Sequence, residues 1–232
     1  MTTKIAILAS GEGTTAEAFI RACAAGQVDA EVDLVICNKA DAGIFDRVIK
    51  LNHDLDLAVE AILINAMTHP AVEGEVVLRG GQTQAEEEAI LKVLADRHID
   101  LVLLMGYLRR IGPKLVHEYG WRNEYLSPYQ ARMLNTHPGL LPETQGFWGV
   151  HVQEHVIDKS LPYGGQTLHV VAEEYDDGPI IAEHQVPVEP SDDAESFFDR
   201  VKATEKQYLP VDIQAFILAR EHYLQTVNGE PA

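Results

Sequence analysis

Short apolar segments alternate with longer segments of helical spacing over most of this chain, and this alternation restricts the folds that it can adopt. The apolar segment 3–8 is followed by a helical pattern over 16–25, and the apolar segment 32–37 by one over 44–51. A strand with almost no polar residue is buried on both faces, as in a parallel sheet covered by helices. The sequence therefore predicts an α/β domain with a mostly parallel, doubly wound sheet and a ligand site at the carboxyl ends of its strands.

The same pattern continues to the end of the chain. Further strands are expected at 59–64, 101–105, 133–136, 166–171 and 180–186, and further helices at 84–97, 113–119, 149–158 and 193–218, the last interrupted near Pro210. The last two strands are expected to form an antiparallel pair. We expect a single domain over 1–232, with a glycine-loop half at about 1–105, a catalytic half at about 106–220 and a tail at about 221–232. The long segments 65–83 and 120–132 fit no element and are expected to be functional or mobile loops.

Composition excludes several classes of partner. The chain has 36 acidic and 18 basic residues and a net charge of −18, which argues against a broad nucleic-acid surface. No segment approaches the run of about 18 apolar residues that a membrane span needs, and residues 1–5 lead straight into a strand pattern, so a signal peptide is not expected. Cys23 and Cys37 lie in apolar segments and are expected to be reduced, buried thiols. We therefore expect a cytoplasmic protein with small-molecule partners, no membrane or nucleic-acid partner and no metal.

A glycine-rich turn, Gly11-Glu12-Gly13-Thr14-Thr15, joins the first expected strand to the first expected helix. Glycines at a helix N-terminus let backbone N–H groups approach an anion, so the turn is a candidate phosphate site. With the next residue it also fits the dinucleotide pattern G-x-G-x-x-A, but the second strand ends without the acidic residue that would hold a ribose. A nicotinamide oxidoreductase and a plain turn that binds nothing stay as alternatives.

Asn135 and His137 are the main candidate catalytic residues. They lie two residues apart in a short expected strand and therefore on the same face, where the strand meets a proline-bounded loop. An amide can donate to a developing alkoxide, and an imidazole can transfer a proton near neutral pH. Asp176, in a turn between the last two strands, could raise the pKa of His137 and orient it. The alternative is a capping Asn, a core His and a turn Asp.

The order of these motifs resembles the folate-dependent formyltransferase family. The matching segments are 135–142 (NTHPGLLP), Asp176 shortly before 178–181 (GPII), the glycine turn, 38–42 (NKADA), 106–111 (GYLRRI) and Glu205. Within the family, the resemblance is to the members of purine synthesis that formylate glycinamide ribonucleotide. A series of motifs in one order is more specific than any one of them.

The resemblance implies a formyl donor, 10-formyltetrahydrofolate, and an amine acceptor that carries a ribose phosphate, glycinamide ribonucleotide. It assigns Asn135 to the formyl oxygen, His137 to the tetrahedral intermediate, and Asp176 to keeping His137 charged and ordering a water. The implied donor site comprises Leu108, Arg109, Arg110 and Ile111, through main-chain contacts, with Asn135, and the implied acceptor site comprises Gly11, Glu12, Gly13, Thr14, Thr15, Pro138 and Glu205. No metal is implied, and the protein is expected to be a monomer or a homodimer.

Several features depart from the family pattern. Glu12 places a negative charge in the turn, so its side chain is expected to point to solvent. Glu143, the segment 145–148, and the long segments 52–83 and 120–132 also differ. These departures leave open a sugar-nucleotide amine as acceptor, water as acceptor in a formyl-folate hydrolase, or a binding protein without activity. The acidic run 86–88 is interpreted as charge that suits the start of a helix.

Overall fold

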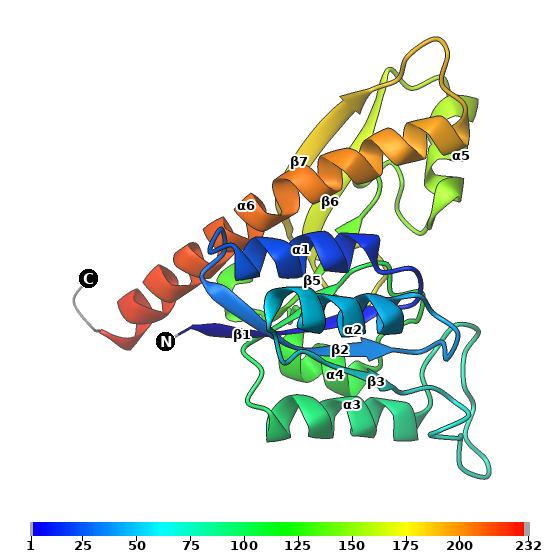
Figure 1. The fold of residues 1–232 in the computed structure, drawn as a ribbon. Coiled ribbons are helices and arrows are strands. Elements are labelled where there is room, and N and C mark those ends of the chain that lie inside the picture. The colour runs from blue at the N-terminus through cyan, green and yellow to red at the C-terminus, as the bar shows by residue number, and fades with distance from the viewer. Residues whose placement is uncertain (1, 230–232) are drawn as a thin grey trace.

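One mixed sheet of seven strands runs through the whole protein in a computed structural model, which describes residues 2–229 (Figure 1). The strands are β1 (Thr3–Ala9), β2 (Ala30–Cys37), β3 (Glu60–Leu63), β4 (Leu101–Leu104), β5 (Met133–His137), β6 (Tyr163–Val170) and β7 (Ile180–Pro187), and their order in the sheet is β3-β2-β1-β4-β5-β6-β7. The first five strands are parallel to one another, whereas β6 runs antiparallel to β5 and to β7. The predicted fold class is confirmed.

Helices cover both faces of the sheet (Figure 1). They are α1 (Thr14–Ala24), α2 (Ile44–Leu55), α3 (Gln84–Asp96), α4 (Pro113–Tyr119), α5 (Val150–Asp158) and α6 (Ala194–Asn228), with a short 3-10 helix, η1 (Pro128–Gln130). Ile5 and Ile7 of β1 pack in a core with Phe19 of α1, whereas Leu8 packs with Ile90 of α3 on the opposite face. The alternation of side chains along each apolar strand thus supplies two cores.

The strand order reverses between β1 and β4, and there the loops that follow the two strands leave on opposite faces of the sheet. The β1 loop leads to α1 on one face, and the β4 loop leads towards α4 on the other. The two loops are joined by hydrogen bonds from Ser10 N–H to the Gly106 carbonyl (3.1 Å) and from Leu108 N–H to Ser10 Oγ (2.8 Å). A crevice at such a reversal is the usual ligand site of a doubly wound sheet.

Helix α6 is continuous through Pro210 and extends to Asn228, so the expected interruption is wrong. Proline removes one helical hydrogen bond and usually destabilises a helix interior by about 3 kcal/mol. The residues Leu209, Ile213 and Phe216, however, are each at most 1% exposed against the sheet. Burial of each side chain stabilises by about 1.5–3 kcal/mol, which outweighs the lost bond. The helix therefore also occupies most of the segment expected to form a tail.

The loop 120–132 is held by packing rather than left free. Its Tyr129 ring lies 5.5 Å from that of Phe216 in α6, and Arg220 donates to the Tyr129 carbonyl at 2.5 Å. Arg220 lies in the part of α6 beyond residue 218, which the sequence analysis did not predict to be helical. Cys37 is buried as expected, whereas Cys23 is only half-buried, and burial raises the pKa of its thiol to about 12.

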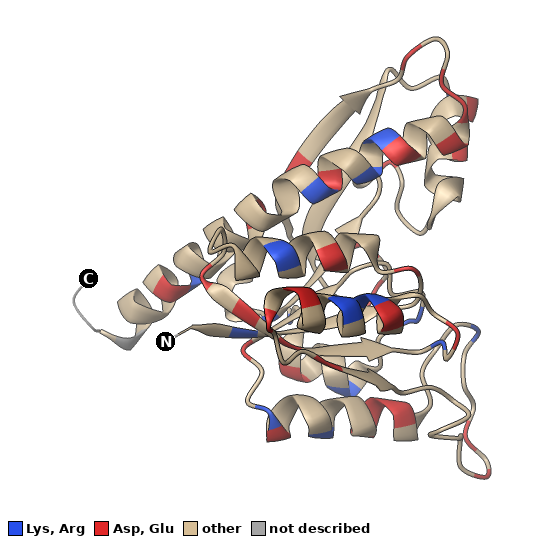
Figure 2. Ribbon diagram, in the orientation of Figure 1, with Lys and Arg blue, Asp and Glu red and all other residues tan. Residues whose placement is uncertain are grey.

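Acidic residues occur in helices, strands and loops along the chain, in keeping with the net charge of −18 (Figure 2). Within residues 2–229, no helix is long and apolar enough to cross a membrane. Over the same residues, no group of three or more His, Cys, Asp or Glu side chains is arranged to hold a metal ion.

Replacement of Gly13 by alanine tests the packing of the glycine turn on α2. Gly13 has φ +70°, and a Cβ atom there would lie 2.2 Å from Ile44 Cδ1. Gly26 has φ +72° with open space around it, so Gly26→Ala is a matched control. We expect Gly26→Ala to destabilise by about 1–2 kcal/mol through backbone strain, and Gly13→Ala by about 1–3 kcal/mol more through overpacking. Urea denaturation measures both, and equal losses would contradict the close contact with Ile44.

Candidate active site

Asn135, His137 and Asp176 come together at the carboxyl end of β5. The period of the strand places Asn135 and His137 on one face, while Thr136 points to the other. Asp176 enters from the turn between β6 and β7, and its Oδ2 atom lies 3.7 Å from His137 Nδ1. His137 is 3% exposed and Asn135 is half-buried, so the amide is the more accessible of the two groups.

A hydrogen bond to Thr144 fixes the orientation of the His137 ring. Thr144 Oγ1 donates its single hydrogen to the Leu140 carbonyl at 2.9 Å, and it lies 2.9 Å from His137 Nε2. A hydroxyl whose hydrogen is engaged can only accept, so His137 Nε2–H is the donor in the second contact. The Nδ1 atom of a neutral His137 then faces Asp176 with its lone pair. Thr144 was not identified from the sequence.

His169 is a further residue of the site that the sequence analysis missed. It lies in β6 directly opposite Asn135, and its Nε2 atom is 3.0 Å from Asn135 Nδ2 and 3.5 Å from Asp176 Oδ1. The ring is 2% exposed, and its Nδ1 atom lies 3.0 Å from the Val170 carbonyl, so Nε2 of a neutral His169 accepts from the amide. An imidazole within the otherwise apolar end of this strand was the available signal, but its partner depended on the pairing register of β5 and β6.

Burial decides the charge of His137. Removal of the ring from solvent lowers its pKa below the ordinary 6.5, and this effect outweighs Asp176, which raises the pKa, while His169 lowers it further. The sequence analysis expected the carboxylate to prevail and keep the imidazole charged. In the free protein His137 is therefore neutral near pH 7.

Asp176 stays ionised in spite of its partly buried position. Burial alone would raise the pKa of its carboxyl, but the rings of His169 and His137 and the N–H of Gly146, which donates to Oδ2 at 3.1 Å, together lower it. Asp176 has φ +52°, a left-handed conformation that Asp adopts more readily than most residues. The result is a fixed negative charge beside two buried imidazoles.

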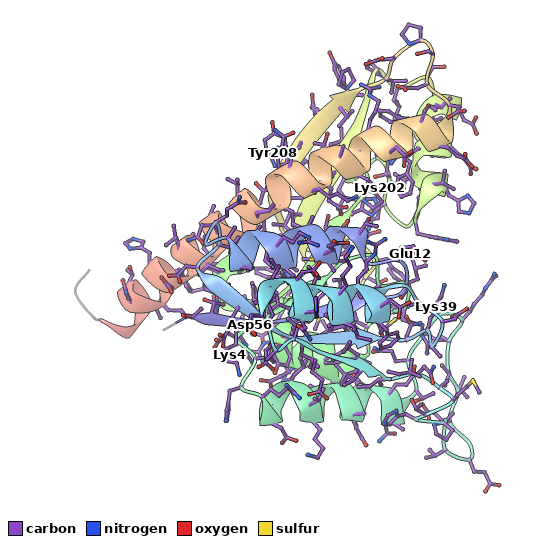
Figure 3. All side chains as sticks on the ribbon, in the orientation of Figure 1. Lys4, Glu12, Lys39, Asp56, Lys202 and Tyr208 are labelled. Atoms are coloured by element: carbon purple, nitrogen blue, oxygen red, sulfur yellow. The ribbon has the colours of Figure 1, made fainter. Side chains whose placement is uncertain are left out.

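The glycine turn forms the N-terminus of α1, with Gly13 as the N-cap residue in a left-handed conformation. The Glu12 side chain is 77% exposed and lies beside Gly43 and Arg47 at the start of α2. Arg47 donates from Nε to the Glu12 carbonyl at 2.6 Å. Glu12 and Lys39 lie on the side of the molecule to which β2 points (Figure 3). The Glu12 carboxylate thus turns towards Arg47.

Glu205 of α6 reaches the back of β5 and the start of α1. Its carboxyl accepts hydrogen bonds from Thr15 Oγ1 (2.7 Å) and Thr136 Oγ1 (2.5 Å). Burial raises the pKa of this carboxyl, although both hydroxyls oppose the rise. Glu205 therefore connects the glycine turn with the strand that carries Asn135 and His137. Pro138 directly follows that strand, and its carbonyl accepts a hydrogen bond from Gln153 of α5.

The segment Leu108, Arg109, Arg110 and Ile111 forms the β4 side of the crevice. Two of its four main-chain N–H groups are engaged within the protein, Leu108 with Ser10 and Arg110 with the Gly80 carbonyl at 2.8 Å. A donor ring bound there would use the N–H groups of Arg109 and Ile111 or the carbonyls of the turn. The Arg110 guanidinium lies over the ring of Tyr175, which brings this turn next to the Asp176 loop.

An amide, an imidazole and a carboxylate thus lie at the strand ends of a doubly wound sheet. This combination suits an α/β enzyme that transfers an acyl-type group. The chain belongs to the formyl transferase family, whose model matches residues 3–213. It is 31% identical to phosphoribosylglycinamide formyltransferase of Haemophilus influenzae, over 94% of this chain and 88% of that protein. The corresponding enzyme of Bacillus subtilis is 28% identical over 92% of this chain and 94% of its own length. The family resemblance found in the sequence is confirmed.

Solved structures agree with the sequence relatives. The crystal structure of phosphoribosylglycinamide formyltransferase from Bacillus halodurans superposes with a TM-score of 0.74, at 32% identity, over 93% of this chain and 95% of that chain. A formyltetrahydrofolate deformylase from Pseudomonas syringae has a TM-score of 0.72 at 20% identity and covers 93% of this chain and 61% of that chain, which is a likeness of fold.

Burial and Asp176 have opposite effects on the pKa of His137, and this opposition can be tested. We expect the His137 imidazole to titrate below pH 6.5 in NMR spectra of the free protein, because burial lowers its pKa. In Asp176→Asn the pKa should fall further, since the substitution removes the one nearby carboxylate that raises it. A His137 pKa that rises in Asp176→Asn would contradict this electrostatic account.

Proposed function

We propose that this protein transfers the formyl group of 10-formyltetrahydrofolate to the amine of glycinamide ribonucleotide. The observation that carries the proposal is the meeting of Asn135, His137 and Asp176 at the end of β5, beside β4, whose following turn is bonded through Ser10 to the loop after β1. Membership of the formyl transferase family supports a folate-type donor, and relatives named phosphoribosylglycinamide formyltransferase support the acceptor.

The first step is attack of the acceptor amine on the formyl carbon, which moves the carbonyl electrons onto oxygen. Asn135 Nδ2 would donate to that oxyanion. An amide has two N–H donors, and the contact with His169 occupies at most one of them. Such a donor, already oriented in a partly buried site, stabilises developing charge without reorganisation. His169 then acts by holding the amide in place.

Proton transfer completes the exchange. The amine loses a proton after it bonds to the formyl carbon, and N10 of the donor gains one as its bond to that carbon breaks. A neutral His137 can accept the first proton and deliver the second. Asp176, 3.7 Å from Nδ1, stabilises the imidazolium that forms between the two events. The acceptor phosphate would lie on the N–H groups at the start of α1, and Glu205 would meet the ribose or the amine.

Formyl-donor consumption with three acceptor conditions tests the proposed reaction. We expect rapid consumption of 10-formyltetrahydrofolate with glycinamide ribonucleotide, and little with a sugar-nucleotide amine or without acceptor. Most of the rate would come from holding two substrates in contact, so the reaction should depend on the correct acceptor. Equal consumption in the blank would make the protein a hydrolase. Consumption only with the sugar-nucleotide amine would show that glycinamide ribonucleotide is not the acceptor. The assignment of formyl-transfer chemistry would stand.

Removal of the His137 imidazole tests the assigned proton transfer. We expect His137→Ala to lower kcat by about a hundredfold or more, which is the usual effect of losing a general acid–base group. His151→Ala on α5 is the matched control and should keep kcat, because that ring is exposed and its recorded contacts are with Glu154 and with the ring of Trp148. Circular dichroism should show that both variants are folded. A kcat near that of the unaltered protein in His137→Ala would remove His137 from the mechanism.

A further inference from the structure

The first turn of α3 and the residues just before it contact the turn that follows β4 in three places, and Gln82 makes the first of these contacts. Its Nε2 donates to the Tyr107 hydroxyl at 3.0 Å, and its Oε1 accepts from Gly112 N–H at 2.8 Å. One side chain therefore spans the turn from its first residues to its last. Gln82 belongs to the long segment 65–83, whose role the sequence left open.

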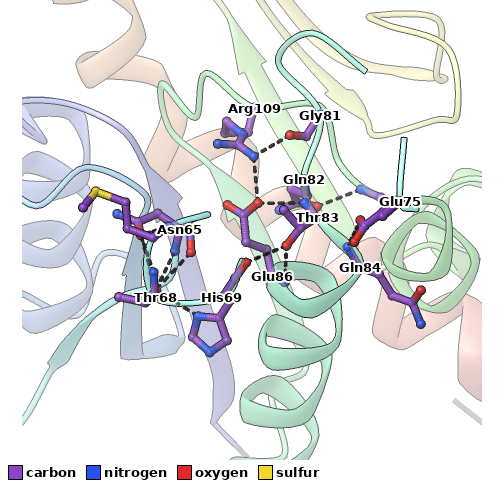
Figure 4. Close-up of polar contacts among 12 residues, drawn as sticks. Asn65, Thr68, His69, Glu75, Gly81, Gln82, Thr83, Gln84, Glu86 and Arg109 are labelled. Atoms are coloured by element: carbon purple, nitrogen blue, oxygen red, sulfur yellow. Dashed lines mark hydrogen bonds and ion pairs between the residues drawn. The ribbon is translucent and has the colours of Figure 1, made fainter. Parts of the chain in front are cut away.

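Glu86 makes the second contact, with Arg109 in the middle of the turn. Glu86 is fully buried, and its Oε2 atom accepts from Arg109 at 2.8 Å and from Thr83 N–H at 2.7 Å. The same guanidinium also donates to the Gly81 carbonyl (Figure 4). Arg109 is thus fixed from two sides, by the carboxylate of α3 and by the backbone of the preceding segment.

Glu87 makes the third contact, at the end of the turn. Its Oε1 atom accepts from Leu115 N–H at 2.9 Å, at the N-terminus of α4, where negative charge is favourable. The carboxylate lies so close to Gly112 that a Cβ atom there would be 2.4 Å from Oε1. Glycine at 112 therefore allows the turn to approach the glutamate. Two buried carboxylates and one amide hold the beginning, middle and end of the turn.

Stability alone is a weak reason for this arrangement. A buried ion pair often stabilises no more than apolar residues of the same volume, because both charges lose their hydration. Within residues 2–229, Glu86 Oε1 and Arg109 Nε are buried without a hydrogen-bond partner, which adds a further desolvation cost. Such a pair does hold the turn in one defined geometry, because any other position of the turn would leave a buried charge unpaired.

We propose that Gln82, Glu86 and Glu87 are positioning residues for the formyl donor, which hold the segment from Tyr107 to Gly112 in the shape that receives the donor ring. The inference rests on the proposed function, which assigns this turn to the donor. It changes the interpretation of the acidic run 86–88. Its first two carboxylates face the turn, and only Glu88 is exposed, where it pairs with Lys114 at 2.7 Å.

Binding of tetrahydrofolate, the deformylated product, measures the effect without any need for turnover. We expect Glu86→Gln to raise the Kd of tetrahydrofolate in calorimetry, and the donor KM, by about tenfold, the size of one lost charged hydrogen bond. The acceptor KM and kcat should change less than about twofold on the same scale. Glu88→Gln is the matched control, two residues along the same helix, and should leave the Kd unchanged because an exposed ion pair contributes little.

A second pair of variants separates positioning from a general loss of structure. If Glu86 acts through Arg109, then Arg109→Met should raise the Kd by about tenfold, and addition of Glu86→Gln should raise it no further. Should Glu86→Gln fail to fold, Gln82→Leu, at a partly exposed position, should show the same donor-specific rise. An unchanged Kd in folded variants, or a double variant with the product of the two single effects, would overturn the inference.

The proposed function is decided by a separate result. The unaltered protein could bind tetrahydrofolate and yet transfer no formyl group to glycinamide ribonucleotide. That result would rule out glycinamide ribonucleotide as the acceptor. The comparison of Kd values would still decide the role of Gln82, Glu86 and Glu87. An unaltered protein that binds no tetrahydrofolate would overturn the donor assignment and the inference together.

Discussion

A single buried serine joins the three loops on which the candidate site depends. Ser10 follows β1, and its Oγ atom donates to Asn38 after β2 at 2.5 Å and accepts from Leu108 N–H after β4 at 2.8 Å. The side chain is 1% exposed, so loss of either bond would leave a buried polar group unpaired. At the reversal of strand order, Ser10 thus holds the glycine turn and the proposed donor turn at a fixed separation.

Charge within this crevice is controlled by burial as much as by partners. Asp176 keeps its negative charge because neighbouring groups lower its pKa, while His137, only 3.7 Å away, loses its charge because burial prevails. A neutral imidazole beside a carboxylate is ready to accept a proton, and the carboxylate then stabilises the product of that transfer. If the imidazole were already charged in the free protein, the carboxylate would stabilise that charge before the substrates met. The proton transfer would then gain no stabilisation from the carboxylate.

The sequence predicted those parts of the structure that follow from local periodicity. Strand alternation placed Asn135 and His137 on one face, and the turn before Pro179 placed Asp176 near them. It missed His169, because its role depends on pairing opposite Asn135, which no local pattern encodes. For the same reason it assigned Glu86 to the helix dipole, although the partner of this residue lies 23 positions away. The continuity of α6 through Pro210 also depended on distant packing.

An acidic protein that accepts an anionic substrate must recognise it through local groups, because its overall field repels anions. With a net charge of −18, the N–H groups at the start of α1 have to supply the attraction that the surface lacks. Glu12 lies within this turn, yet Arg47 draws its carboxylate towards α2 and also pairs with Glu17 at 2.5 Å. Arg47 thereby offsets part of the charge of both carboxylates. The proposed binding of phosphate by the turn would then depend on the geometry that Gly13 allows, and Arg47 would limit the repulsion that Glu12 adds.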